Sequence, residues 1–135
     1  MPRVRIALGE EESASVEAMT EAIYGRVLPF LETRGVYLTW CGNHAKHRAS
    51  GSDKYVTITT ERKAFDVERI MQVYPALDRT LFETDGSSYR LKRIMVEEPM
   101  DKYITNGDFI MAMLVAGYTA VMTDDSVNCT FLPPK

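Results

Sequence analysis

Alternating apolar and polar positions open the chain, and a helical repeat follows them. Apolar side chains at Val4, Ile6 and Leu8 alternate with polar or small ones, which predicts a first strand with one buried face. From residue 16 to residue 31, apolar side chains recur every three or four positions, which predicts a long amphipathic helix. Ser13 or Ser15 should cap this helix and Gly35 should end it, while an internal proline at position 29 should kink or divide it.

Three further patterns occupy the middle of the chain. Residues 36–41 and 55–60 are rich in β-branched and aromatic side chains, and we expect them to pair as a hairpin across a long polar loop at residues 42–53. Asp66 should cap a second helix, which Pro75 ends or restarts. The Asp85–Gly86 pair is a turn signal, so residues 89–96 are predicted to form the second strand of another hairpin.

The last third of the chain predicts a buried helix and a closing hairpin. Asn106 should cap a helix that runs to about Ala116 and is apolar nearly all round, as helices buried on most of their surface are. Gly117 closes this helix, and strands follow at residues 118–122 and 127–132. The predicted fold class is α+β: a single domain over residues 1–135 with a mostly antiparallel sheet of hairpins and about three helices packed on one face.

The composition narrows the class of protein. Apolar residues make up 45% of the chain, charged residues make up 26%, and the net charge is −3. This balance is typical of a globular domain and argues against a disordered protein, a membrane protein or a protein that coats nucleic acid through bulk positive charge. The first residues lack the apolar stretch of a secretory signal, so we expect a cytoplasmic protein.

A cluster of potential metal ligands follows the second predicted strand. Cys41, His44 and His47 are spaced three residues apart, and Cys129 would complete a set of two cysteines and two histidines if the sheet brings it close. Zinc takes four such ligands in a closed tetrahedral site. The alternative interpretation is a free buried thiol at a strand end beside two exposed loop histidines, with no cofactor.

Cations gather in the same polar region, which is a candidate site for a partner or for phosphate. Arginine and lysine side chains with nearby hydroxyls and glycine amides suit a phosphate group, and Trp40 and Tyr55 flank the region and could stack a base. The candidate residues are Lys46, Arg48, Ser50, Lys54, Arg62 and Lys63, extended by Arg90, Lys92 and Arg93 if their segment is adjacent. The alternative is a solvated loop whose charges keep the protein soluble.

Common enzyme signatures do not occur in the sequence. It contains no Gly-x-Ser-x-Gly elbow, no Gly-x-x-x-x-Gly-Lys phosphate loop and no Gly-x-Gly-x-x-Gly turn after the first strand. A nucleophile and base formed by Cys41 and His44 remains formally possible. The lack of these signatures in the sequence favours a protein that is not an enzyme.

One segment resembles a known group of proteins. The run from Tyr103 to Tyr118, in which Asn-Gly opens a helix and Gly-Tyr closes it before a short hairpin, is similar to the C-terminal end of small uncharacterised phage and prophage proteins. The resemblance implies a phage-borne accessory gene, whose product binds and blocks a host component such as a defence complex, as anti-CRISPR proteins do. It implies no catalytic residue.

Three hypotheses for function follow. The leading one is a non-enzymatic phage or mobile-element protein that binds and inhibits or modulates a host protein or ribonucleoprotein. The second is a phosphate-directed binder of nucleic acid or a nucleotide that uses the basic segment 44–63. The third is a zinc-supported domain or small hydrolase that uses Cys41, His44 and His47.

Overall fold

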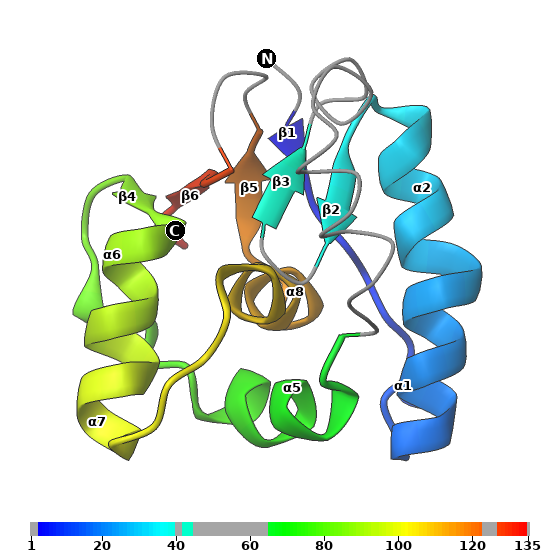
Figure 1. Cartoon of the computed structure of the whole chain (residues 1–135), viewed down its shortest axis with the longest axis horizontal. Helices are drawn as coiled ribbons and strands as arrows, with labels where there is room; N and C mark the ends of the chain where they lie inside the picture. The colour runs from blue at the N-terminus through cyan, green and yellow to red at the C-terminus, as the bar shows by residue number, and fades with distance from the viewer. Residues whose placement is uncertain (1–2, 40–41, 45–64, 123–126, 135) are drawn as a thin grey trace, which may run out of the picture.

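The computed structural model describes residues 3–39, 42–44, 65–122 and 127–134. This part of the chain forms four helices, a four-stranded antiparallel sheet and a separate two-stranded ribbon. Figure 1 looks along the helix α8 (Asn106–Val115), with α5 (Val67–Val73) below it and the remaining helices on either side. The predicted α+β class with a mostly antiparallel sheet is confirmed.

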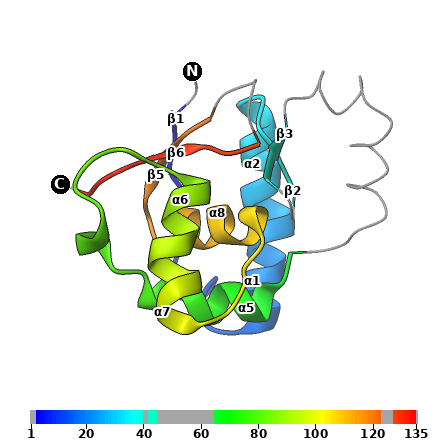
Figure 2. The same ribbon diagram turned by 60° about the vertical axis from the view of Figure 1, so that its left-hand side comes forward.

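The four-stranded sheet joins the two ends of the chain. Its order is β1 (Arg3–Val4), β5 (Thr119–Val121), β6 (Thr130–Leu132) and β4 (Gly86–Ser87), and every neighbouring pair is antiparallel. Strands β5 and β6 form the closing hairpin that the sequence predicts. In Figure 2 these strands lie above α8, against which β6 packs through an edge-on contact of Phe131 with Phe109 at 6.2 Å.

The separate ribbon differs from the predicted hairpin. Strand β2 (Tyr37–Thr39) pairs with β3 (Gly42–His44), so the polar loop expected from residue 42 begins as a strand. The predicted strand at residues 55–60 lies outside the described residues.

The first helix follows its prediction closely. It comprises α1 (Val16–Ala22), the π-helical turn η1 (Ile23–Val27) and α2 (Leu28–Thr33). Ser15 caps it by accepting a hydrogen bond from the amide of Ala18 at 3.1 Å, and Gly35 follows its end with a φ of 75°.

Two prolines explain two π-helical turns. Proline lacks an N–H group, and in an α-helix its ring collides with the carbonyl group four residues before it. Pro29 is the second residue after η1, and Pro99 is the second residue after the π-helical turn η4 (Arg93–Glu97). In each turn a carbonyl accepts from the amide five residues later, so the wider turn accommodates the proline within a continuous helix.

The predicted strand at residues 89–96 is wrong, because this segment is helical. The helix comprises α6 (Ser88–Lys92), η4 and α7 (Glu98–Met100), and the hydroxyl of Ser87 caps it by accepting from the amide of Arg90 at 3.3 Å. The buried side chains here, at positions 88, 91, 92, 95 and 96, have helical spacing. The turn signal at Asp85–Gly86 leads into β4, which pairs with β6 and not with the following segment.

The remaining helices surround α8. Asp66 caps α5, as predicted, by accepting from the amide of Arg69 at 3.1 Å, and two 3-10 turns follow, η2 (Tyr74–Ala76) and η3 (Arg79–Leu81). Thr105, and not Asn106, caps α8 by accepting from the amide of Asp108 at 3.2 Å.

Helix α8 forms the centre of the core. Every residue from 107 to 114 is buried, which confirms the prediction of a helix covered on most of its surface. None of the helices in the described ranges is long and apolar enough to cross a membrane.

Candidate partner-binding surface

The structure describes three of the nine residues predicted to bind a partner or phosphate. Arg90, Lys92 and Arg93 lie on the helix formed by α6 and η4, whereas Lys46, Arg48, Ser50, Lys54, Arg62 and Lys63 lie outside the described residues. The basic segment around residues 44–63 therefore stays a prediction. Because this segment is a helix and not the predicted strand, the directions of the three described side chains follow helical geometry.

Helical geometry separates Lys92 from its two neighbours. Arg90 and Arg93 are three residues apart, so they share the outer face of the helix, and both are exposed. Lys92 lies on the inner side of the helix and is 5% exposed. A strand would have placed Arg90 and Lys92 on one face, so the change of secondary structure changes the site.

The ammonium group of Lys92 holds a neighbouring segment against the helix. Its Nζ donates to the backbone carbonyl of Ile104 at 3.1 Å and lies 3.4 Å from Oε2 of Glu97. The same Glu97 oxygen accepts from the backbone amide of Ile104 at 3.3 Å. Lys92 and Glu97 together satisfy both backbone polar groups of Ile104, which anchors the segment between α7 and α8. We therefore assign Lys92 a positioning role.

Two exposed tyrosines flank the same ammonium group. Nζ of Lys92 lies 4.5 Å from the ring centroid of Tyr103 and 5.6 Å from that of Tyr89, within the range of cation–π attraction. Tyr103 is nevertheless 71% exposed and Tyr89 is 56% exposed. Ile104 is buried, and its backbone forms hydrogen bonds with Lys92 and Glu97. The backbone next to the exposed Tyr103 is therefore held in place.

The exposed arginines lie on the same helix as Tyr89. Tyr89 and Arg93 are four residues apart on the helix and therefore adjacent on its surface. Arg93 approaches Glu98 at 3.9 Å, but both side chains are more than half exposed, so this ion pair contributes little and leaves the guanidinium accessible. We call Tyr89, Arg90, Arg93 and Tyr103 the α6 surface.

The α6 surface offers side chains that can bind a partner. Its members supply two guanidinium forks, two phenol hydroxyls and two aromatic faces. Tyrosine and arginine are enriched in protein interfaces, and their large side chains dominate the binding free energy there. The arrangement suits a macromolecular partner that carries carboxylates.

The described residues include only part of the predicted set of metal ligands. Cys41 and His47 lie outside them, and the backbone of His44 pairs with Tyr37 in the β2–β3 ribbon. Cys129 is buried next to β6, and its backbone amide donates to the hydroxyl of Ser88 at 3.2 Å. Within the described ranges no three histidine, cysteine, aspartate or glutamate side chains lie close enough to hold a metal ion. The zinc site stays a prediction.

Burial should make the thiol of Cys129 unreactive. Desolvation raises its pKa from the ordinary value of 9.0 to about 12, and thiolates, not thiols, attack disulfide reagents. In a Cys41→Ser variant we expect no reaction with an aromatic disulfide at pH 8 until denaturant is added, and then one equivalent of released thiolate. Rapid reaction of the folded variant would contradict the buried position.

The same shift of pKa has a consequence for stability. The unfolded chain ionises this thiol above about pH 9, whereas the folded chain keeps it protonated up to about pH 12. The unfolded state therefore binds fewer protons over this range, and Cys129 lowers the free energy of unfolding as the pH rises through it.

Sequence analysis missed the two tyrosines of this surface. Tyr103 lies in the polar run that follows Pro99, and Tyr89 lies between Ser88 and Arg90 in a segment predicted to be a strand. The available signal was the helical spacing of buried residues from Ser88 to Val96, which leaves Tyr89, Arg90 and Arg93 outside the buried stripe. The position of Tyr103 depends on the tertiary contact between Lys92 and Ile104, which no local pattern encodes.

No protein-family model matches this chain, and neither the curated proteins nor the solved structures contain a significantly similar protein.

Proposed function

We propose that this chain is a non-enzymatic binding protein that docks through the α6 surface onto an acidic surface of a macromolecular partner. The observation that carries the proposal is the pair of exposed tyrosines whose rings both lie close to the ammonium group of the buried Lys92, with Arg90 and Arg93 on the same helix as Lys92. Tyrosines supply contact area with little loss of conformational freedom, because each has two side-chain torsions. The arginines supply bidentate hydrogen bonds to carboxylates.

The pairing of Lys92 with Glu97 supports a surface that is organised before binding. A docking surface loses less affinity when its side chains and backbone are already ordered. The contacts of Lys92 and Glu97 with Ile104 fix the backbone next to Tyr103 in the free protein. The exposed part of the α6 surface then carries the charge of two arginines, which steers an acidic partner toward it.

The resemblance of residues 103–118 to phage proteins suggests which partner to test. Under this proposal the partner is a host protein or ribonucleoprotein, which the chain inhibits or modulates by occupying its acidic surface. Tyr103, the first residue of the similar segment, belongs to the α6 surface. Treating the host lysate with nuclease before capture distinguishes a protein from a ribonucleoprotein.

Substitutions in the α6 surface should strongly reduce capture of the partner. We expect the Tyr89→Ala/Arg93→Glu variant to recover at least tenfold less of the stoichiometric partner that the unaltered protein recovers from a host lysate, because it loses an aromatic anchor and reverses a charge. Quantitative mass spectrometry of the eluates measures the ratio.

A matched control replaces an exposed apolar residue and an exposed arginine elsewhere. Leu81 is 40% exposed and Arg34 is exposed at the end of α2, so the Leu81→Ala/Arg34→Glu variant makes equivalent changes away from the α6 surface. Equal loss of capture in both variants would refute the proposed surface. Loss restricted to a Lys46→Glu/Arg48→Glu variant would move the contact to the predicted basic segment.

A further inference from the structure

A second cationic site lies where the first strand meets the end of α8. A cleft of about 540 Å³ is lined by Arg3, Arg5 and Arg79, by residues 116–119 and by residues 132–134. Its volume falls within the range of small-molecule sites. Three guanidinium groups from distant parts of the chain therefore share one cleft, which the α6 surface does not include.

The strand pattern explains why two of these arginines point outward together. Val4 and Ile6 are buried, so Arg3 and Arg5 occupy the opposite, exposed side of the extended chain at β1. Arg79 comes from η3, whose cap Asp78 accepts from the amide of Thr80 at 2.9 Å. The fold thus places Arg79 in the same cleft as Arg3 and Arg5.

One of the three guanidinium groups is positioned by a hydrogen bond to the backbone. Nε of Arg5 donates to the carbonyl of Gly117 at 3.1 Å, which covers a carbonyl at the end of α8. This contact uses one of the five N–H donors of the guanidinium. Arg79 and Tyr118 line the same cleft, and burial raises the pKa of Tyr118, an effect that the charge of Arg79 partly offsets.

Among the described residues, no carboxylate side chain lines the cleft and neutralises the arginines. Asp78 acts on Tyr118 from nearby, but it accepts from both the amide and the hydroxyl of Thr80 and is not part of the lining. Close cations repel one another, so an anion that binds between them relieves this repulsion and gains charge-assisted hydrogen bonds.

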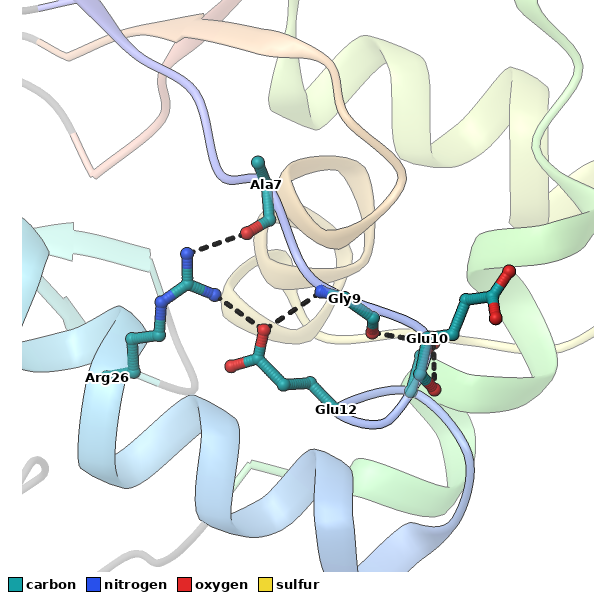
Figure 3. Close-up of polar contacts among 6 residues, drawn as sticks. Ala7, Gly9, Glu10, Glu12 and Arg26 are labelled. Carbon is teal, nitrogen blue, oxygen red and sulfur yellow. Dashed lines mark hydrogen bonds and ion pairs between the residues drawn. The ribbon is translucent and has the colours of Figure 1, made fainter.

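A neighbouring arginine shows the contrasting case. Arg26 and Arg5 line a smaller cavity of about 240 Å³ between the first strand and helix η1. Figure 3 shows that Arg26 is already paired: its Nη1 lies 2.8 Å from Oε1 of Glu12, and its Nη2 donates to the carbonyl of Ala7 at 2.7 Å. The same Glu12 oxygen accepts from the amide of Gly9 at 2.9 Å. Arg26 therefore fastens the strand to the helix, and the 540 Å³ cleft is the better anion site.

We propose that this cleft binds a phosphate group carried by a small organic moiety, in the manner of a nucleoside diphosphate or a phosphorylated nucleic-acid end. Arginine forks match the geometry of phosphate oxygens. The lining also includes the apolar residues Ala116, Leu132, Pro133 and Pro134, which can contact the organic part of the ligand. This inference does not depend on the partner proposed for the α6 surface.

Calorimetric titration of the whole protein with inorganic pyrophosphate and with a nucleoside diphosphate tests the proposal. At low salt we expect both to bind, with at least tenfold weaker binding to an Arg3→Gln/Arg79→Gln variant and weaker binding to the unaltered protein at high salt. An Arg34→Gln/Lys102→Gln variant removes two exposed positive charges outside both the cleft and the α6 surface and should bind as the unaltered protein does. No binding at low salt, or equal affinity in both double variants, would overturn the site.

Two further comparisons of binding affinity identify the ligand. The nucleoside diphosphate should bind more tightly than pyrophosphate, because its organic part gains contact with the apolar lining, and equal affinity would overturn that part of the proposal. Tighter binding of a 5′-phosphorylated oligonucleotide than of its unphosphorylated form would assign the phosphate to a nucleic-acid end. Equal binding of the two oligonucleotides, with retained binding of the diphosphate, would assign it to a free nucleotide. Circular dichroism verifies that each variant is folded.

Discussion

A protein in which methionine replaces Lys92 should lose about 3 kcal/mol of unfolding free energy, because the change leaves a partly buried carboxylate and a carbonyl without their partner. The methionine keeps much of the length and apolar volume of the lysine stem, so the loss reports on the ammonium group. That group donates to Ile104 at 3.1 Å and lies 3.4 Å from Glu97. The carboxylate side chain is 21% exposed, which places the expected loss near the lower end of the range for broken buried pairs. Chemical denaturation measures it.

The adjacent arginine provides the matched control. Arg93→Met makes a comparable substitution one position later, but Arg93 is exposed and its ion pair with Glu98 spans 3.9 Å in water. We expect the free energy of unfolding to change by less than about 0.5 kcal/mol. Similar losses in both variants would show that the ammonium group of Lys92 has no special structural role.

A double-mutant cycle separates the ion pair from the rest of the environment. Glu97→Gln keeps an oxygen that can accept from the amide of Ile104 but removes the charge that faces Lys92. If the two side chains act together, the losses from Lys92→Met and Glu97→Gln should not add, and the double variant should be more stable than their sum predicts. Lys92→Met should also weaken capture of the partner indirectly, by releasing the backbone next to Tyr103.

Local chemistry predicted the elements whose ends carry strong signals. Ser15, Gly35 and Asp66 act at helix ends as their residue types indicate, and the hairpin of β5 and β6 follows from its two apolar runs. The features at the helix ends depend on interactions between residues a few positions apart. A single sequence contains that information.

For the segment after Gly86, the local sequence pattern does not determine the secondary structure. Tyr89, Leu91 and Met95 fit an alternating strand, while Ser88, Leu91 and Met95 fit a helix, so the pattern alone permits both structures. The choice depends on β4, which pairs with β6 more than 40 residues later along the chain and directs the following residues onto α8. Long-range pairing of this kind has no local signature.

The two candidate sites depend on tertiary structure to different degrees. Sequence analysis named Arg90 and Arg93, which the predicted strand would have placed on opposite faces and which the observed helix places on one face. It noted that Val4, Ile6 and Leu8 alternate with polar or small residues, which include Arg3 and Arg5, without predicting a site there. Arg79 completes the cleft from a distant 3-10 turn, so the convergence of the three cations could not be read from spacing.

Replacing Gly42 by alanine should destabilise the protein by roughly 4 kcal/mol, because two independent penalties combine at this position. Its φ of 134° is a conformation that residues with a side chain rarely adopt. An added Cβ would also lie 2.4 Å from the carbonyl oxygen of Val127 and 2.7 Å from Nδ2 of Asn106, which itself donates to that carbonyl at 3.1 Å. Thermal and chemical denaturation measure the loss.

Two other glycines separate these penalties. Gly35 has a φ of 75° but no atom within 4 Å of an added Cβ, so Gly35→Ala carries the conformational cost alone, about 1 kcal/mol. Gly25 lies within the helix without either restriction, so Gly25→Ala should stabilise the protein by about 0.5 kcal/mol. If Gly42→Ala costs no more than Gly35→Ala, the close approach of β3 to the segment before β6 is absent in solution. A much larger cost would support the close approach of Gly42 to Val127 and Asn106.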